Sequence, residues 1–169
     1  DKEEIGSVGI SGMQSHYFEH FMEGLCDAQG VKLSDCFANS FCLSADVSNA
    51  FDPNWPETCD KRNNSQLNYG VAICKYTGSR GKGGASDASA EAMGHVRSTL
   101  DKAGVIWQIA TLGKVDQGGG GTVAAYMANR NIVTVDAGVP VLSMHAPLEL
   151  VSKLDCYETM LACKAIYLA

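Results

Sequence analysis

The sequence predicts an α/β fold in which helices pack against a largely buried sheet. Two observations support this prediction. Segments with the alternating hydrophobic pattern of strands take turns with segments whose period of about 3.6 residues marks helices, and Gly or Asn stands at most of the changes. In addition, no internal repeat and no linker divides the 169 residues, which are enough to bury a core of ordinary size. We therefore expect one domain, or one piece of a domain.

The first half of the chain contains one predicted helix and two predicted strands. Residues 13–27 place apolar side chains on one helical face, and Gly30 ends the segment in the manner of a C-cap. The apolar residues 41–47 predict a buried strand, a loop rich in Asn, Pro and Asp covers 49–68, and 69–76 predict a second strand. The apolar helical face consists of Phe18, Phe21, Met22 and Leu25.

The second half repeats this alternation of helices and strands. Residues 86–103 predict a helix capped by its initial Ser or Asp, and 105–110 predict the strand that follows. A short helix is expected over 122–129, directly after a run of four glycines. The β-branched, apolar residues 132–136 are typical of a central strand. Apolar residues at helical spacing predict a final amphipathic helix over 148–168.

Composition argues against several kinds of partner. The net charge of -6 is spread along the chain and no basic stripe is present, so we expect no nucleic acid as a partner. No apolar run approaches the roughly 20 residues that span a bilayer, so we expect a soluble protein with no membrane partner.

The seven cysteines are an odd number without a Cys-x-x-Cys pair, which favours free thiols in a reducing cytoplasm. Because the chain opens on charged residues without Met, we expect a piece of a longer protein.

Four side chains at the ends of predicted strands are candidates for a metal site. Glu3 and Glu4 precede a Gly-rich turn, Asp46 closes an apolar strand, and His145 follows a strand and loop. Each feature alone has an ordinary structural explanation, since paired surface acids are usually solvated and a lone His is usually a hydrogen-bonded structural residue. Together, carboxylate and imidazole ligands from the ends of several strands are what a catalytic zinc site needs. Glu3 would then be free to accept a proton from metal-bound water.

Five motifs follow one another along the chain: Asp1 to Ser7, Gly12 to Ser15, Ser44 to Val47, Gly113 to Thr122 and Leu142 to His145. In the order and spacing of these motifs the chain resembles the M18 (aspartyl aminopeptidase) family of metalloaminopeptidases, and the resemblance covers essentially its whole length. The stretch 75–82 and the Gly-rich run are similar to the bacterial branch of that family.

The resemblance implies a three-layer, zinc-exopeptidase-like sandwich, of which residues 1–169 are the C-terminal portion of the catalytic domain. It implies that Glu3 is the general base, that Glu4 and His145 are ligands of one metal, and that Asp46 is a ligand of the other. The two ions would be divalent metals, most simply zinc, with cobalt or manganese as alternatives. A further His and a bridging Asp of the family, and its inserted oligomerisation domain, precede the Glu-Glu motif and are absent here.

This reduced ligand set predicts weak metal binding by the 169 residues alone. One metal would keep two protein ligands and the other a single ligand, whereas catalytic zinc normally has three. We therefore expect the isolated chain neither to bind two metals tightly nor to hydrolyse peptides. The resemblance implies peptide substrates and a homo-oligomer, in this family a dodecamer, for the parent protein.

The substrate-binding candidates are a glycine run and a lysine. The resemblance places Gly118, Gly119, Gly120, Gly121 and Thr122 against the substrate backbone, where glycines permit close approach. A phosphate cradle is an alternative for such a loop, but the Lys-Ser/Thr of a P-loop is lacking. Lys75 falls near the position that selects an acidic N-terminal residue in the eukaryotic branch, although a Lys at a strand end is often only solvated.

Two competing functions remain open at the level of the sequence. His16 and His20 form a His-x-x-Glu-His motif on a predicted helix, the signature of a different class of zinc protease. Against it, Phe18 and Phe21 are expected to direct one side of that helix to the core, and no third ligand is evident. A catalytically inactive binding or assembly fragment of the same fold is the other alternative.

Overall fold

The computed structural model describes residues 6–78, 80, 83–84, 86–114 and 116–169. Glu3 and Glu4 lie outside the described residues. The helices are α2 (Tyr17–Gln29), α3 (Leu33–Ala38), the 3-10 helix η1 (Pro56–Thr58), α4 (Ala90–Ala103), α5 (Ala124–Ala128) and α6 (Lys153–Tyr167). The strands are β1 (Phe41–Ser44), β2 (Ser48–Asn49), β3 (Val71–Cys74), β4 (Trp107–Ile109), β5 (Val133–Gly138), β6 (Pro140–Leu142) and β7 (Leu150–Val151).

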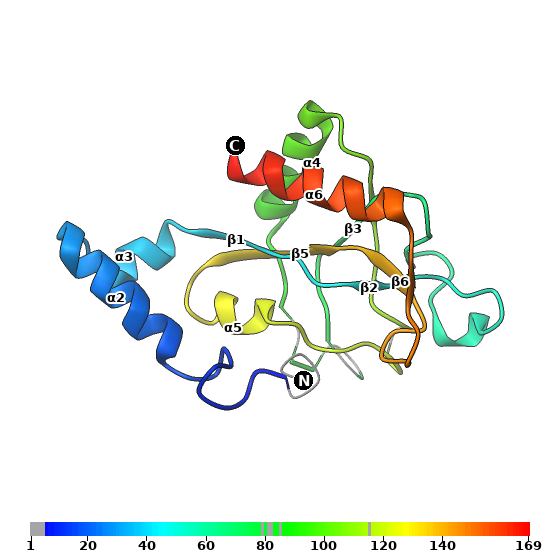
Figure 1. Ribbon diagram of the computed structural model, residues 1–169, viewed down its shortest axis with the longest axis horizontal. Helices are drawn as coiled ribbons and strands as arrows, with labels where there is room; N and C mark the ends of the chain where they lie inside the picture. The colour runs from blue at the N-terminus through cyan, green and yellow to red at the C-terminus, as the bar shows by residue number, and fades with distance from the viewer. Residues whose placement is uncertain (1–5, 79, 81–82, 85, 115) are drawn as a thin grey trace.

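The strands form two mixed sheets. In the larger one the order is β1-β5-β3-β4, with β1 parallel to β5, β3 antiparallel to β5, and β4 parallel to β3. The smaller sheet has the order β2-β6-β7. Since β1 leads to β2 and β5 leads to β6, the two sheets meet at the carboxyl ends of β1 and β5 (Figure 1), whereas β3 and β4 run in the opposite direction.

Helices cover the larger sheet in layers, as Figure 1 shows, with α4 and α6 beyond one side of β1 and β5 and α5 beyond the other. The main core lies between β3, β5, α4 and α6, where β-branched strand residues meet small and aliphatic helix residues. Burial of such side chains is the main force that holds the layers together. The fully buried members of this core include Val71, Ile73, Val96, Leu100 and Val135.

The amino end of α6 is attached to the start of β3 by a buried carboxylate. Asp155 is 1% exposed, and its two oxygens accept hydrogen bonds from the backbone N–H groups of Asn68 and Gly70, both at 2.8 Å. Ser152 caps the helix, because its hydroxyl accepts from the N–H groups of Leu154 and Asp155. Asp155 thus fixes where α6 lies on the sheet.

The structure corrects several expected boundaries. The strand predicted over 41–47 ends at Ser44, so Asp46 lies in the link to β2 and does not close a strand. The last helix begins at Lys153, since 150–151 pair with β6 as β7. Short elements escaped prediction because two or three residues carry no periodicity.

The expected apolar face of the first helix is also corrected. The helix begins at Tyr17, and Phe21 and Leu25 are 60% and 44% exposed, so they do not belong to the core. Phe18 stacks on Phe37 of α3, with ring centroids 5.8 Å apart. In the part of the chain that the structure covers, no helix is both long and apolar enough to cross a membrane.

Candidate functional site

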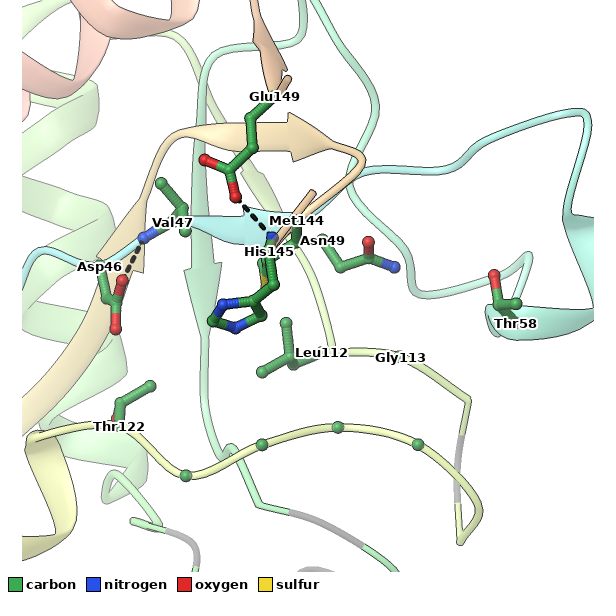
Figure 2. Close-up of a pocket in the computed structure, with 14 residues that line it drawn as sticks. Asp46, Val47, Asn49, Thr58, Leu112, Gly113, Thr122, Met144, His145 and Glu149 are labelled. Carbon is green, nitrogen blue, oxygen red and sulfur yellow. Dashed lines mark hydrogen bonds between the residues drawn. The ribbon is translucent and has the colours of Figure 1, made fainter. Parts of the chain in front are cut away.

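A pocket of about 550 Å³ lies where the two sheets meet, and it brings together most of the predicted site residues. Figure 2 shows the imidazole of His145 and the carboxylate of Asp46 on one side and the glycine run on the other. The lining residues are Asp46, Val47, Asn49, Thr58, Leu112, Gly113, Gly118, Gly119, Gly120, Gly121, Thr122, Met144, His145 and Glu149.

Asp46 is presented to this pocket by the short link between β1 and β2. Its side chain is exposed, and Oδ1 accepts a hydrogen bond from the N–H of Val47 at 2.7 Å. The end of β5 packs tightly against this link, since a Cβ at Gly138 would stand 1.4 Å from the carbonyl oxygen of Asp46. Only glycine can occupy that position without displacing the backbone that carries the carboxylate.

His145 is presented by a turn that follows β6. Both Ser143 and His145 have positive φ values, 59° and 66°, in the left-handed region that non-glycine residues enter at a cost of about 1 kcal/mol or more. The turn is closed by a hydrogen bond from the N–H of Ala146 to the carbonyl of Ser143, at 2.9 Å. Glu149 accepts from the N–H of His145 at 2.5 Å (Figure 2), so a second carboxylate lies at the pocket beside the imidazole.

The glycine run forms the opposite wall and is attached to a second Gly-containing segment. The N–H of Gly78 donates to the carbonyl of Gly120 at 2.7 Å, and a Cβ at Gly119 would stand 2.1 Å from the carbonyl oxygen of Gly78. Gly119 also has φ +97°. Glycine is therefore required at this contact, which exposes backbone groups of the run toward the pocket.

Behind this wall lies a buried carboxylate that the sequence did not single out. Asp136 of β5 is 6% exposed, and Oδ1 accepts a hydrogen bond from the hydroxyl of Thr122 at 2.7 Å. Burial raises the pKa of Asp136, and the nearby charge of Asp46 adds to this rise, while the Thr122 hydroxyl opposes it. The sequence places Asp136 at the end of a β-branched run, and this residue was interpreted only as part of the strand.

A second pocket, of about 400 Å³, extends the site toward the beginning of the chain. Gly6 and Ser7 are the first described residues after the Glu-Glu pair, and they line this pocket together with Asp46 and Thr122. Asp46 thus borders both pockets. Glu3 and Glu4 themselves lie outside the described residues, so their predicted roles stay predictions.

Lys75 is not among the residues that line either pocket. Its ammonium group is paired with the carboxylate of Asp87, and both side chains are well exposed. Exposed pairs of this kind contribute about 1 kcal/mol or less. The role predicted for Lys75 would require it to leave Asp87.

The alternative His-x-x-Glu-His motif is engaged in contacts within the protein. His16 Nδ1 lies 2.5 Å from Glu19, and Arg130 pairs with the other oxygen of that carboxylate at 2.6 Å. The hydrogen bond from His16 is the largest cause that lowers the pKa of Glu19, followed by the charge of Arg130. The guanidinium also donates to the carbonyls of Met13 and Tyr126, at 2.9 and 2.8 Å. A carboxylate so engaged anchors the loop before α2 and is poorly placed to activate water.

The donor chemistry of the main pocket fits a divalent metal in part. A carboxylate and an imidazole, from Asp46 and His145, are common zinc ligands, and both line one pocket. Among the described residues, no group of three His, Cys, Asp or Glu side chains could hold a metal ion. The prediction from the sequence also did not include Glu149, although this residue stands only four residues after His145.

Comparison with known proteins gives a consistent family. The model described as Aminopeptidase I zinc metalloprotease (M18) matches residues 1–167. The Probable M18 family aminopeptidase 1 of Clostridium acetobutylicum is 51% identical over 163 residues, and a protein of the same name from Borreliella burgdorferi is 45% identical over 173 residues. The matches cover 94% and 99% of this chain but 35% and 38% of those relatives. The chain thus spans little more than a third of their length.

Solved structures agree with the fold. An M18 family aminopeptidase from Thermotoga maritima has a TM-score of 0.93 and 43% identity, over 98% of this chain and 38% of that one. Aminopeptidase I from Clostridium acetobutylicum has a TM-score of 0.89 and 49% identity, over 98% of this chain and 36% of that one. The mApe1 dodecamer of S. cerevisiae has a TM-score of 0.78 and 25% identity, over 98% and 36%. These structures confirm the predicted α/β sandwich.

Proposed function

Since the chain belongs to the M18 family of zinc metalloproteases, we propose that it supplies part of the active site of a two-metal aminopeptidase. The observation that carries this proposal is the meeting of Asp46, His145 and the glycine run in one pocket. Nothing in the sequence alone required these three distant segments to be adjacent. Asp46 follows the carboxyl end of β1, which is parallel to β5, and α/β proteins often bind ligands beyond the carboxyl ends of parallel strands.

In this proposal Asp46 is a ligand of one metal, and His145 and Glu4 are ligands of the other. Glu3 accepts the proton of the attacking water as general base. When bound, zinc supplies Lewis acidity and lowers the pKa of water to about 7. The remaining ligands, a His and a bridging Asp, come from sequence that precedes residues 1–169, which form the C-terminal portion of the catalytic domain.

The main-chain groups of Gly118 to Thr122 line the pocket opposite His145, and we assign them to the backbone of the peptide substrate. Release of an acidic N-terminal residue would use Lys75, which must then exchange Asp87 for the substrate's carboxylate. Because the Lys75 pair is exposed, the exchange costs little. The parent protein would act on peptides in the cytoplasm as a homo-oligomer, and the dodecamer named for a structural relative makes a dodecamer the assembly to test.

The test is to express the full-length protein that contains this chain and to measure aminopeptidase activity. Chelation should abolish hydrolysis of Asp-, Glu- and Leu-p-nitroanilide, and zinc, cobalt or manganese should restore it. His145→Ala and Asp46→Asn should each lower kcat/KM by more than about 100-fold, since even residues that only support ligands cost 10 to 100-fold. His20→Ala, on exposed α2, is the matched control.

Three results would contradict the proposal. Activity that survives chelation would exclude the metal mechanism. A loss of activity in His20→Ala with full activity in His145→Ala would favour the His-x-x-Glu-His alternative. An inactive full-length protein that binds metal would favour the assembly or binding fragment.

A further inference from the structure

Asp136 stands where the strands that feed the pocket come to an end. On β5 it is the register partner of Ser44, the last residue of β1, and of Cys74, the last residue of β3. The loops that leave β1 and β3 therefore start on either side of it. One loop carries Asp46 two residues later, and the other carries Thr77 three residues later.

The two oxygens of Asp136 face two hydroxyl groups from different loops. Thr122, at the end of the glycine run, donates to Oδ1 at 2.7 Å. Thr77, which precedes Gly78, donates to Oδ2 at 3.5 Å, and the Thr77 and Thr122 hydroxyls lie 3.5 Å apart. Thr77 is 4% exposed, so these contacts are protected from water. One carboxylate thus holds both Gly-containing segments.

The contacts between those segments continue the same attachment. Beyond Thr77, the N–H of Gly78 donates to Gly120 at 2.7 Å and the N–H of Arg80 donates to Gly118 at 3.4 Å. A glycine run has no side chains with which to fix its own conformation, and glycine loses more conformational entropy on folding than other residues do. An anchor outside the run is therefore needed to keep its backbone groups in one place.

We propose that Asp136 is a positioning residue that holds the glycine run, through Thr122 and Thr77, in the conformation that binds the substrate backbone. Only the second part of this proposal, the binding of the substrate backbone, rests on the proposed function of the pocket. Asp136 is buried and belongs to no ion pair among the described residues, so its oxygens depend on hydrogen bonds such as those from Thr122 and Thr77. Asp136 acts through the run and contacts no substrate.

The variants separate the hydroxyl contact from the bulk of the side chains. Thr122→Val removes the donor and keeps the shape, while Thr122→Ser keeps the donor. Asp136→Ala removes both acceptors at once. Since Ala at a buried strand position can weaken folding, Thr122→Val keeps the proposal testable if Asp136→Ala does not fold.

Two measurements on the full-length protein test the attachment of the glycine run and its role in substrate binding. Amide hydrogen exchange in peptides that span 77–80 and 118–122 should become at least tenfold faster in Thr122→Val and Asp136→Ala, and Thr122→Ser should restore slow exchange. For tripeptide substrates, KM should rise about tenfold in Thr122→Val while kcat changes less than threefold, because a binding wall is loosened and the reacting groups stay in place.

Each outcome decides a separate point. Unchanged exchange in both disruptive variants would overturn the attachment. Faster exchange with an unchanged KM in an active enzyme would overturn the positioning role, and a fall in kcat at constant KM would assign Asp136 to the metal site instead. If the wild-type protein has no aminopeptidase activity, the proposed function fails and the exchange data alone judge the attachment.

Discussion

The attachment of α6 to β3 by Asp155 permits a quantitative prediction. Its carboxylate is 1% exposed and accepts two backbone hydrogen bonds, from Asn68 and Gly70, each 2.8 Å long. Hydrogen bonds to a charged group contribute about 1.5–3 kcal/mol each. Asp155→Ala removes both and leaves two N–H groups without their acceptor, so we expect the free energy of unfolding to fall by about 3–5 kcal/mol.

The isosteric change gives a smaller effect. Asp155→Asn keeps one acceptor oxygen but directs an amide NH₂ toward the other N–H, so we expect a loss of about 1.5–3 kcal/mol. Asp27→Asn is the matched control, because Asp27 is an exposed carboxylate in the last turn of α2. Its effect should stay within about 0.5 kcal/mol.

Urea unfolding at one fixed protein concentration is the assay. The midpoint should fall in the order Asp27→Asn, Asp155→Asn, Asp155→Ala, with an unchanged m-value. A loss of less than about 1 kcal/mol for Asp155→Ala would refute the reasoning, because the two bonds would then be replaced by water without cost.

Four further predictions concern the site and the thiols. Zinc titration of the 169-residue chain by calorimetry should give no submicromolar two-site isotherm, since the proposed ligand set lacks a His and a bridging Asp, and His20→Ala should leave that titration unchanged; tight two-site binding would contradict this. Gly138→Ala should lower stability by about 3 kcal/mol or more and disturb Asp46, because the added Cβ would stand 1.4 Å from its carbonyl oxygen; a wild-type melting temperature would count against it. Burial raises the pKa of the Cys74 thiol to about 11, so at pH 8 iodoacetamide should modify exposed Cys156 and spare Cys74. Because the pKa of Cys74 in the folded state lies above its unfolded value near 9, ionisation of Cys74 leaves the free energy of unfolding unchanged below about pH 9. By pH 11 it lowers the free energy of unfolding by up to about 3 kcal/mol; constant stability over that window would refute this prediction.

The sequence predicted the family and the layered fold well, and both predictions are confirmed by the family match and the structural relatives. Long periodic segments such as α4 and α6 were found because many residues repeat one pattern. The strands β2 and β7 were not found, because each has two residues and exists only through its partner strand β6. Pairing between distant segments leaves no local trace in such short stretches.

The candidate site was predicted in part. Asp46, His145 and the glycine run were named from the sequence and lie in one pocket, while their catalytic assignments stay predictions. Lys75 was chosen because the family resemblance puts it near a position that selects an acidic residue, and its pairing with Asp87 depends on a contact between separate segments. Asp136 was missed because its strand context gave no sign of the two hydroxyl groups that tertiary structure brings to it.

The position of β1 in the larger sheet has a practical consequence for handling this chain. Within the described residues β1 pairs only with β5, and its apolar residues Phe41 and Leu43 border an open pocket with α2 and α6. A free strand edge beside apolar surface is a template for intermolecular pairing. Prepared alone, the 169 residues should therefore aggregate in a concentration-dependent manner.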